Sequence, residues 1–425
     1  MKSIRLRVFV SILVTLAALT VHARQDWRAA ALAAFDETWQ TVNDTHYDRS
    51  FAGVNWTEVK AELRPKAEQA ETPDAVREVI VEMLARLRQS HFALLTSSPA
   101  GQPMPGDAIV PIEVRVNDEG LLITRVDDPG LERIVQPGDI VVTIDGTDPI
   151  AMSAGADERA RRLDAWRRAT RAFHGSEGSA ARLVVRHVDG HTREVDVIRA
   201  RKPGDMVQLG NLPPLRVRTE VREARTRSGQ RVGVIRFNIW MIAVGGPFAA
   251  AIDTFRDAEG LVIDLRGNPG GLAEMMRGIA GHVLAEPDLL GTMHMRDAVL
   301  EFRANPRRST GDGRRVEPFS GRLAILVDEL TASASECFAG GLQDLGRARI
   351  FGTQTMGQAL PAATRQLSNG DVLMYAIADF VTSKNRSLEG QGVVPDETVA
   401  LSRAALAAGR DEPLERALAW IDRQG

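Results

Sequence analysis

The stretch Leu323-Ala-Ile-Leu-Val-Asp328, followed by Thr331-Ala-Ser-Ala-Ser-Glu336, carries the most informative pattern of the chain. Its first part is a short apolar run and its second part consists of small residues that open a helix, so we expect a buried strand that passes directly into a helix. A serine at such a junction projects its hydroxyl from a sharp turn, where the helix N-terminus favours developing negative charge. Ser333 is therefore a candidate nucleophile, although the Gly-x-Ser-x-Gly form is absent.

A purely structural role for Ser333 fits the same residues. Ser333-x-x-Glu336 is a capping-box pattern, and this segment alone does not separate a helix cap from a nucleophile. Ser335 is the rival serine, but it falls inside the first helical turn, which suits packing better than attack. Cys337 is the only cysteine, so no internal disulfide can form, and a core position is favoured over a second nucleophile.

A glycine-rich turn, Asp264-Leu-Arg-Gly-Asn-Pro-Gly-Gly271, ends the apolar strand that precedes it. Open α/β sheets place their sites at this edge, and paired glycines can aim a backbone N–H into a cleft. Gly270 and Gly271, together with Ala334, are therefore predicted to form an oxyanion hole. A plain loop or a phosphate cradle is the alternative, but neither Gly-Lys-Ser/Thr nor Gly-x-Gly-x-x-Gly accompanies the turn.

The N-terminal part begins as a signal peptide over residues 1–23, with a basic start, an apolar run and a small-residue cleavage site at Val21-His22-Ala23. An uncleaved N-terminal anchor is the alternative, although the run is short for a membrane span. Residues 24–98 are predicted to be helical. Within them, Thr72 is the expected N-cap of a helix whose first residue is Pro73.

Residues 99–203 alternate short strands with turns and are predicted to form a separate β domain. Val135-Gln-Pro-Gly-Asp-Ile140, followed by Ile144-Asp-Gly146, resembles a PDZ domain. Such a module binds a peptide as an added strand and grips its C-terminal carboxylate. Residues 204–425 are predicted to be α/β, with a helix over Pro247–Arg256, a tight turn at Asn369-Gly370 and one long helix from Ser402 to about Ile421.

Three motifs together resemble the S41 peptidases, a family that includes the C-terminal-processing peptidases and the tricorn-core proteases. They are the Asp264–Gly271 turn, the Ser333-Ala-Ser-Glu336 segment and Glu389-Gly-Gln-Gly-Val-Val-Pro-Asp396. The resemblance covers almost all of the mature chain. It implies an α/β fold: a crotonase/ClpP-like core of β-β-α units, preceded by a helical segment and carrying an inserted PDZ-like domain.

The resemblance also implies a choice of catalytic base. The processing branch uses a lysine in a Gly-Lys-Gly turn, where this chain has Gln358, and Lys384 is out of register. The tricorn-like branch uses a histidine, and this chain carries Ser90-His91 where that branch has its Ser-His pair. Ser333 is thus implied as nucleophile and His91 as general base, oriented by Ser90 and Glu389.

The predicted function is that of a periplasmic or secreted serine endopeptidase that cleaves peptides or unfolded proteins near their C-termini. The remaining histidines lack metal-ligand spacing, so we expect neither a metal nor a cofactor. The net charge of −3 gives no reason to expect nucleic acid as a partner, and no integral membrane span is expected in the mature chain. A non-catalytic binder of hydrophobic ligands and a PDZ-based adaptor are the alternatives.

Overall fold

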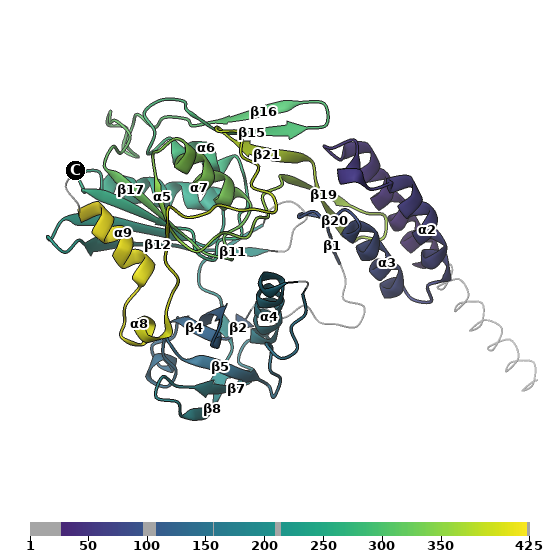
Figure 1. The fold of residues 1–425 in the computed structure, drawn as a ribbon, viewed down its shortest axis with the longest axis horizontal. Helices are drawn as coiled ribbons and strands as arrows, with labels where there is room; N and C mark the ends of the chain where they lie inside the picture. The colour runs from purple at the N-terminus through teal and green to yellow at the C-terminus, as the bar shows by residue number, and fades with distance from the viewer. Residues whose placement is uncertain (1–26, 97–107, 156, 209–213, 423–425) are drawn as a thin grey trace, which may run out of the picture.

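The computed structural model describes residues 27–96, 108–155, 157–208 and 214–422. The signal peptide expected over residues 1–23 lies outside these ranges. Figure 1 shows three regions: a group of N-terminal helices at one end, a central α/β layer structure, and a small β region beside it. The mixed α/β fold expected from the sequence is confirmed.

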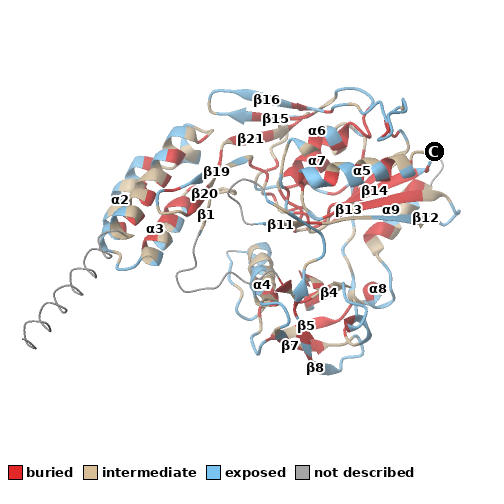
Figure 2. Cartoon of the chain, turned by 180° about the vertical axis from the view of Figure 1, so that it is seen from behind, coloured by how far each residue is buried: buried red, intermediate tan, exposed pale blue. Residues whose placement is uncertain are grey.

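The central region is built on a six-stranded sheet in the order β12-β13-β14-β17-β18-β22. Only β12 is antiparallel to its neighbour. The sheet is buried on both faces, which explains the unbroken apolar runs of its inner strands (Figure 2). The strands are β12 (Thr219–Arg225), β13 (Arg231–Phe237), β14 (Gly260–Asp264), β17 (Arg322–Val327), β18 (Arg349–Gly352) and β22 (Glu397–Thr398).

Helices cover both faces of this sheet. Three helices, α5 (Ile242–Thr254), α6 (Met275–Ala280) and α7 (Ala334–Asp344), pack on one face around the largest apolar core. A single helix, α9 (Glu412–Asp422), packs on the other face. The carboxyl ends of β14 and β17 therefore lie side by side, and each leads into one of the two sequence motifs.

Two predicted helix boundaries were wrong for local reasons. Helix α5 begins at Ile242, five residues before the predicted start, so Pro247 lies inside the helix after Gly245 and Gly246. The single C-terminal helix is two, α8 (Arg403–Ala407) and α9, because Gly409 adopts φ +70° and ends the first.

A second, smaller sheet packs against α7. The strands β16 (Val299–Arg303), β15 (Leu289–Met295) and β21 (Ala378–Thr382) form an antiparallel sheet against it. The β19–β20 hairpin (Ala362–Gln366 and Val372–Ala376) contains the expected turn, with Gly370 at φ +87°. That hairpin reaches out toward the N-terminal helices.

The N-terminal region packs onto this hairpin. Residues 27–45 are helical and are followed by η1 (Phe51–Gly53), α2 (Trp56–Gln69) and α3 (Pro73–Ala85). Thr72 caps α3 as predicted, its side chain accepting the Ala75 N–H. The chain then forms strand β1 (Ala93–Leu95), which pairs with β20. Leu373 of β20 packs into the core of the N-terminal helices. The segment is thus joined to the central region immediately after His91.

The small β region forms a five-stranded antiparallel sheet in the order β3-β4-β5-β7-β8, with α4 (Glu158–Phe173) packed on it. β3 is an edge strand beside α4. The sheet strands are β3 (Ile112–Asn117), β4 (Gly120–Val126), β5 (Ile140–Ile144), β7 (Ala180–Arg186) and β8 (Thr192–Ile198). Shorter elements are β2 (Ala108–Ile109), η2 (Leu131–Arg133), β6 (His174–Gly175), β9 (Ala200–Arg201), β10 (Asp205–Val207) and β11 (Leu215–Val217).

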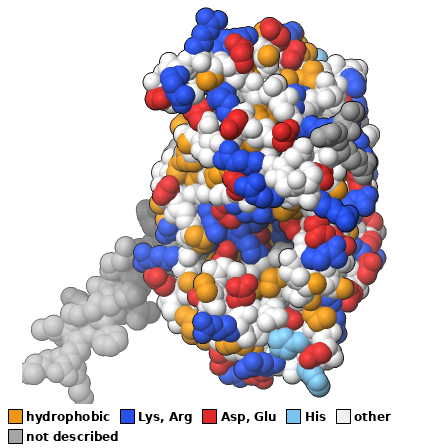
Figure 3. Space-filling view, turned by 90° about the vertical axis from the view of Figure 1, so that its left-hand side faces the viewer, with side chains coloured by type: hydrophobic (Ala, Val, Ile, Leu, Met, Phe, Trp, Pro, Cys, Tyr) orange, Lys and Arg blue, Asp and Glu red, His pale blue; other side chains and the backbone are white. Residues whose placement is uncertain are grey.

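Arginine side chains make many of the contacts between the small β region and the centre. Arg115 and Arg125 of the β region pair with Asp328 and Glu220 of the centre. Arg236, on β13, pairs with Glu113 on β3. Figure 3 shows Lys and Arg side chains gathered in a hollow in the middle of one face, with Asp and Glu around them. The joint between the two regions is therefore strongly ionic.

In the part of the chain that the structure describes, no helix has both the length and the apolar character needed to cross a membrane.

Candidate active site

Ser333 lies at the junction of β17 and α7, as the sequence predicted, and is the N-cap residue of α7. Its backbone adopts φ +55° and ψ −124°, a conformation that non-glycine residues rarely adopt. Such strain persists only where the surroundings impose it, and it is common at functional sites. The sharp turn expected of a nucleophile elbow is therefore present without the usual glycines.

Asp328, at the end of β17, holds the turn that leads to Ser333. Its carboxylate accepts the Gly267 N–H at 2.8 Å and the Leu330 N–H at 3.1 Å, and the carboxylate is paired with Arg115. One side chain thus ties the glycine-rich turn to the serine turn. Sequence reasoning did not assign Asp328, although its position at the end of a buried strand was a usable signal.

Glu336 is fully buried beneath Ser333 and does more than cap the helix. Its carboxylate accepts the Ser333 N–H at 3.1 Å, as the capping-box pattern predicted. It also accepts the N–H groups of Gly357 and Gln358, at 2.6 and 2.9 Å, and the Thr355 hydroxyl at 2.5 Å. Burial raises the pKa of Glu336 to about 7, against these hydrogen bonds, which lower it. The capping residue therefore organises the neighbouring loop 355–358.

The glycine-rich turn lies directly against Ser333. A Cβ added at Gly270 would be 2.5 Å from Ser333 Cβ, so only glycine allows this approach. The Gly270 N–H donates to Asn268 Oδ1 at 3.0 Å and is not free. Among the described residues, the N–H groups of Gly271 and Ala334 have no acceptor. Of the three residues predicted for an oxyanion hole, two thus have an available donor.

His91 lies in the turn between α3 and β1 and is largely buried. Ser90 Oγ lies 2.8 Å from His91 Nδ1 and donates to Glu389 Oε2 at 2.9 Å, and the Ser90 N–H donates to Glu389 Oε1 at 2.8 Å. Because the single hydroxyl proton of Ser90 goes to the carboxylate, Ser90 Oγ accepts from His91 Nδ1. The proton of the neutral imidazole is then on Nδ1, and Nε2 carries a free lone pair.

The imidazole is held in its neutral form. Burial lowers the pKa of His91 to about 4, so the ring is uncharged at neutral pH. A neutral ring with an unprotonated Nε2 can accept a proton. The structure therefore brings Ser90, His91 and Glu389 together.

Residues 358 and 359 contact both halves of the site. The Gln358 carbonyl accepts the Ser333 N–H at 2.8 Å, and the Ala359 N–H donates to Glu389 Oε2 at 3.0 Å. The single peptide group between residues 358 and 359 thus connects the serine turn to the carboxylate that accepts from Ser90. Gln358, the residue that replaces the expected lysine, joins the halves through its backbone.

The other candidate nucleophiles and bases have structural roles. Ser335 is fully buried and its hydroxyl accepts the Trp240 indole N–H at 2.8 Å. Cys337 is buried in the core, and burial raises the pKa of its thiol. Lys384 is exposed on a turn after β21, where its backbone N–H contacts Asp344. None of these three side chains is placed to replace Ser333 or His91.

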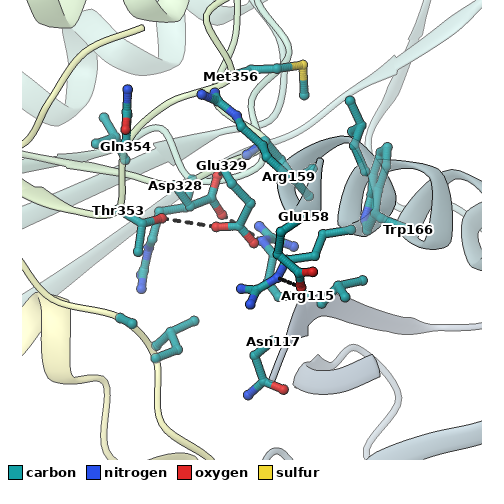
Figure 4. A pocket seen from close by; sticks show the side chains of 18 of the residues that line it. Arg115, Asn117, Glu158, Arg159, Trp166, Asp328, Glu329, Thr353, Gln354 and Met356 are labelled. Carbon is teal, nitrogen blue, oxygen red and sulfur yellow. Dashed lines mark hydrogen bonds and ion pairs between the residues drawn. The ribbon is translucent and has the colours of Figure 1, made fainter. Parts of the chain in front are cut away.

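A pocket of about 590 Å³ lies between the β region and the core (Figure 4). Gln358 is one of the residues that line it. Strand β3 and helix α4 form one side of it, and the loops around Glu329 and Met356 form the other. Its apolar lining includes Trp166 and Met356. Arg159 of α4 spans the pocket and donates to the Thr355 carbonyl.

Two family profiles match separate parts of the chain. Residues 231–399 match "Peptidase family S41", and residues 27–85 match "Tricorn protease C1 domain". A carboxyl-terminal-processing protease of Synechocystis sp. is 27% identical over 394 residues, covering 90% of this chain and 84% of its own. A protease of the same name from Picosynechococcus sp. is 26% identical, with coverages of 85% and 82%.

Solved structures share the fold. A photosystem II D1 C-terminal processing protease aligns with TM-score 0.56 and 22% identity, covering 89% of this chain and 94% of its own. A CPAF mutant aligns with TM-score 0.65 and 14% identity, with coverages of 94% and 99%. The tricorn protease aligns with TM-score 0.53 and 17% identity over 93% of this chain and 37% of its own. At these identities the likeness concerns the fold alone.

Proposed function

The chain belongs to peptidase family S41, and we propose that it hydrolyses peptide bonds with Ser333 as nucleophile and His91 as general base. The observation that carries the proposal is the hydrogen-bonded series Glu389–Ser90–His91, which leaves Nε2 unprotonated in a neutral ring. Residues 358–359 bond to both ends of this arrangement, which supports a single site.

In the proposed mechanism, His91 Nε2 takes the hydroxyl proton of Ser333 as Oγ attacks the scissile carbonyl carbon. Negative charge develops on the carbonyl oxygen, and the N–H groups of Gly271 and Ala334 stabilise it. Gly270 contributes by lacking a side chain, which lets the glycine-rich turn lie against Ser333. The protonated imidazole then gives its proton to the leaving amine, and a water molecule activated by His91 hydrolyses the acyl-enzyme.

The series from Glu389 through Ser90 has an orienting role. A neutral imidazole is a base at only one nitrogen, and the partner of the other nitrogen decides which. Ser90 accepts from Nδ1, and Glu389 in turn orients the Ser90 hydroxyl. The positive charge that appears on His91 during turnover is stabilised by the Glu389 carboxylate through the intervening hydroxyl.

We further propose that the substrate enters by its C-terminal tail along the pocket beside β3. The expected PDZ-like module supports this, because β3 is an edge strand and α4 lies alongside it, as β-strand addition requires. The relatives are named carboxyl-terminal-processing proteases. The apolar pocket lining suits apolar tail residues of a peptide or an unfolded protein.

The finer architecture and the location are part of the same proposal. The core would be a crotonase/ClpP-like arrangement of β-β-α units, and the PDZ-like domain would be an insertion before it. Residues 1–23 have the sequence character of a signal peptide, which supports a periplasmic or secreted enzyme.

Labelling with a fluorophosphonate probe tests the nucleophile. We expect the wild type to react and Ser333→Ala to lose all labelling, because only a base-activated hydroxyl attacks phosphorus rapidly. His91→Ala should slow labelling by about 10²–10⁴-fold. Ser335→Ala is the matched control and should still be labelled.

The same experiment distinguishes the alternatives. An unlabelled wild type, or labelling that survives Ser333→Ala, would overturn the peptidase proposal in favour of a hydrophobic-ligand binder or an adaptor. For the tail-binding step, cleavage of a peptide with a free carboxylate is compared with that of its C-terminal amide. Equal KM values for the two peptides would contradict recognition of the carboxylate.

A further inference from the structure

The turn that carries Ser90 and His91 is strained on both sides. Helix α3 ends at Ala85, and the two non-glycine residues Arg88 and His91 then adopt left-handed conformations, with φ of +53° and +61°. Such conformations persist only when neighbouring groups hold them. Glu389 holds Ser90 from the core side. The remaining residue of the turn, Gln89, is held from another direction.

Gln89 is bound at both ends of its side-chain amide. Its Oε1 lies 2.9 Å from His46 Nε2, and its amide nitrogen donates to the Tyr47 hydroxyl at 2.8 Å. The oxygen end of the amide faces His46 and the nitrogen end faces Tyr47, so both ends of the side chain are held. Both partners come from the loop after the first helix, more than forty residues earlier in the chain.

His46 is itself locked in position. It is fully buried, and its Nδ1 lies 2.8 Å from the Asp48 carbonyl oxygen and 3.1 Å from the Asp48 backbone nitrogen. Because the amide oxygen of Gln89 can only accept, Nε2 carries the proton in its contact with Gln89 Oε1. The ring also stacks on Phe92, with centroids 5.7 Å apart and planes 7° apart, and Phe92 directly follows His91.

The loop that contains His46 is tied to the core as well. Arg296, at the tip of the β15–β16 hairpin, donates to the carbonyl of Asn43 at 2.8 Å and reaches that of His46 at 3.4 Å. The chain of contacts therefore runs from the core hairpin through His46 to Gln89 and the strained turn. From the core, the Glu389 carboxylate holds the same turn through its two hydrogen bonds with Ser90.

We infer that Gln89 and His46 are positioning residues of the reaction, which fix the imidazole of His91 by clamping the turn on the side opposite to Glu389. The inference rests on the proposed function and deepens it. In the proposed mechanism neither Gln89 nor His46 touches the substrate. Their loss is therefore expected to lower kcat and to leave KM unchanged, because substrate binding is made elsewhere while the base becomes misplaced.

The primary test is Gln89→Met, which keeps the length of the side chain and removes both hydrogen bonds. We expect the rate of fluorophosphonate labelling and kcat to fall about 10- to 100-fold, the loss that a small displacement of a reacting group produces. KM and the thermal midpoint should stay close to those of the wild type. Gln40→Met is the matched control, because Gln40 is exposed and bonds only to Asp44 on its own helix; it should change neither rate.

Further variants test the same contacts, and Tyr47→Phe and His46→Gln keep the inference testable if Gln89→Met folds poorly. Tyr47→Phe removes only the acceptor of the Gln89 amide and should slow labelling by a smaller factor. His46→Phe combined with Gln89→Met should lose no more activity than Gln89→Met alone, because both changes break one contact chain. His46→Gln, which retains a donor, should recover part of the rate lost in His46→Phe.

The outcomes separate the two levels of the argument. A wild type that is not labelled overturns the proposed function and this inference together. A labelled wild type with normal labelling of Gln89→Met and Tyr47→Phe overturns the positioning role alone. A raised KM at unchanged kcat would also overturn it, since that result would place Gln89 in substrate binding.

Discussion

Ser333 and His91 both have a positive φ, which non-glycine residues rarely adopt, yet the two residues are held by different kinds of contact. Ser333 sits where a buried parallel strand meets a helix, and Asp328 and Glu336, which hold its turn, lie within five residues of it. His91 lies in a turn that follows the N-terminal helices, and Glu389, which accepts the hydroxyl proton of the neighbouring Ser90, is 299 residues away from that serine.

The surroundings of Ser333 and of His91 are made rigid in different ways. The serine side is built inside one close-packed core, where strand, turn and helix are contiguous in sequence. The histidine side is assembled between the N-terminal helices and the core. It depends on a few long-range polar contacts. We therefore expect the histidine side to be the first to lose its geometry, while the serine side survives.

Glu389→Gln should give the largest effect among the changes that separate the two sides. The Glu389 carboxylate accepts three hydrogen bonds, two from Ser90 and one from the Ala359 N–H, and an amide offers one acceptor in place of two. We expect kcat/KM for a tail peptide to fall about 10²-fold. Glu397→Gln, the same change on β22, serves as control and should retain activity. Wild-type kcat/KM in Glu389→Gln would show that the series is not needed.

The pH dependence of kcat/KM should follow the titration of His91 alone. The pKa of His91 is lowered to about 4, so the base stays neutral and kcat/KM stays constant from neutral pH down to about pH 5. Below that, activity should fall with a midpoint near pH 4. A midpoint near pH 7 would instead point to Glu336, and would place the pH-sensitive element on the serine side.

The free energy of unfolding at acid pH provides a control for the pH profile of activity. His282 is also buried with its pKa lowered to about 4, and it lies outside the site. A histidine with a lowered folded-state pKa contributes stability above its unfolded pKa of about 6.5, and this is lost as the pH falls toward 4. His282→Phe should therefore reduce acid unfolding, by up to about 3 kcal/mol, and leave the activity profile unchanged.

Gln358→Ala should give the smallest effect. Gln358 contacts both Ser333 and Glu336 through its backbone, and alanine preserves both hydrogen bonds. We expect kcat/KM near that of the wild type. Gln358→Pro removes the N–H that donates to Glu336. This variant should therefore have a lower kcat/KM and react more slowly with the fluorophosphonate probe. A large loss in Gln358→Ala would give its side chain a role in the pocket that it lines.

Local sequence was sufficient where the contacts are local. The strand–turn–helix around Ser333, the Thr72 cap and the Asn369-Gly370 turn were all predicted, because each depends on residues within a few positions of one another. The same local rules misplaced the start of α5 and merged α8 with α9. There, the conformations of Gly409 and of the residues around Pro247 decided the boundaries.

What only the tertiary structure decided is how the distant parts meet. Glu389 was implied only by the family resemblance, and the contact of its carboxylate with Ser90 depends on how the core packs against the N-terminal helices. The clamp formed by His46 and Gln89 left no sequence signal, because neither residue belongs to a motif. Sequence patterns record the preferences of neighbouring residues, whereas contacts across hundreds of residues follow from the packing of whole elements. The sequence alone therefore determined the strand–turn–helix that carries Ser333, and tertiary packing decided how His91, the proposed base, is held.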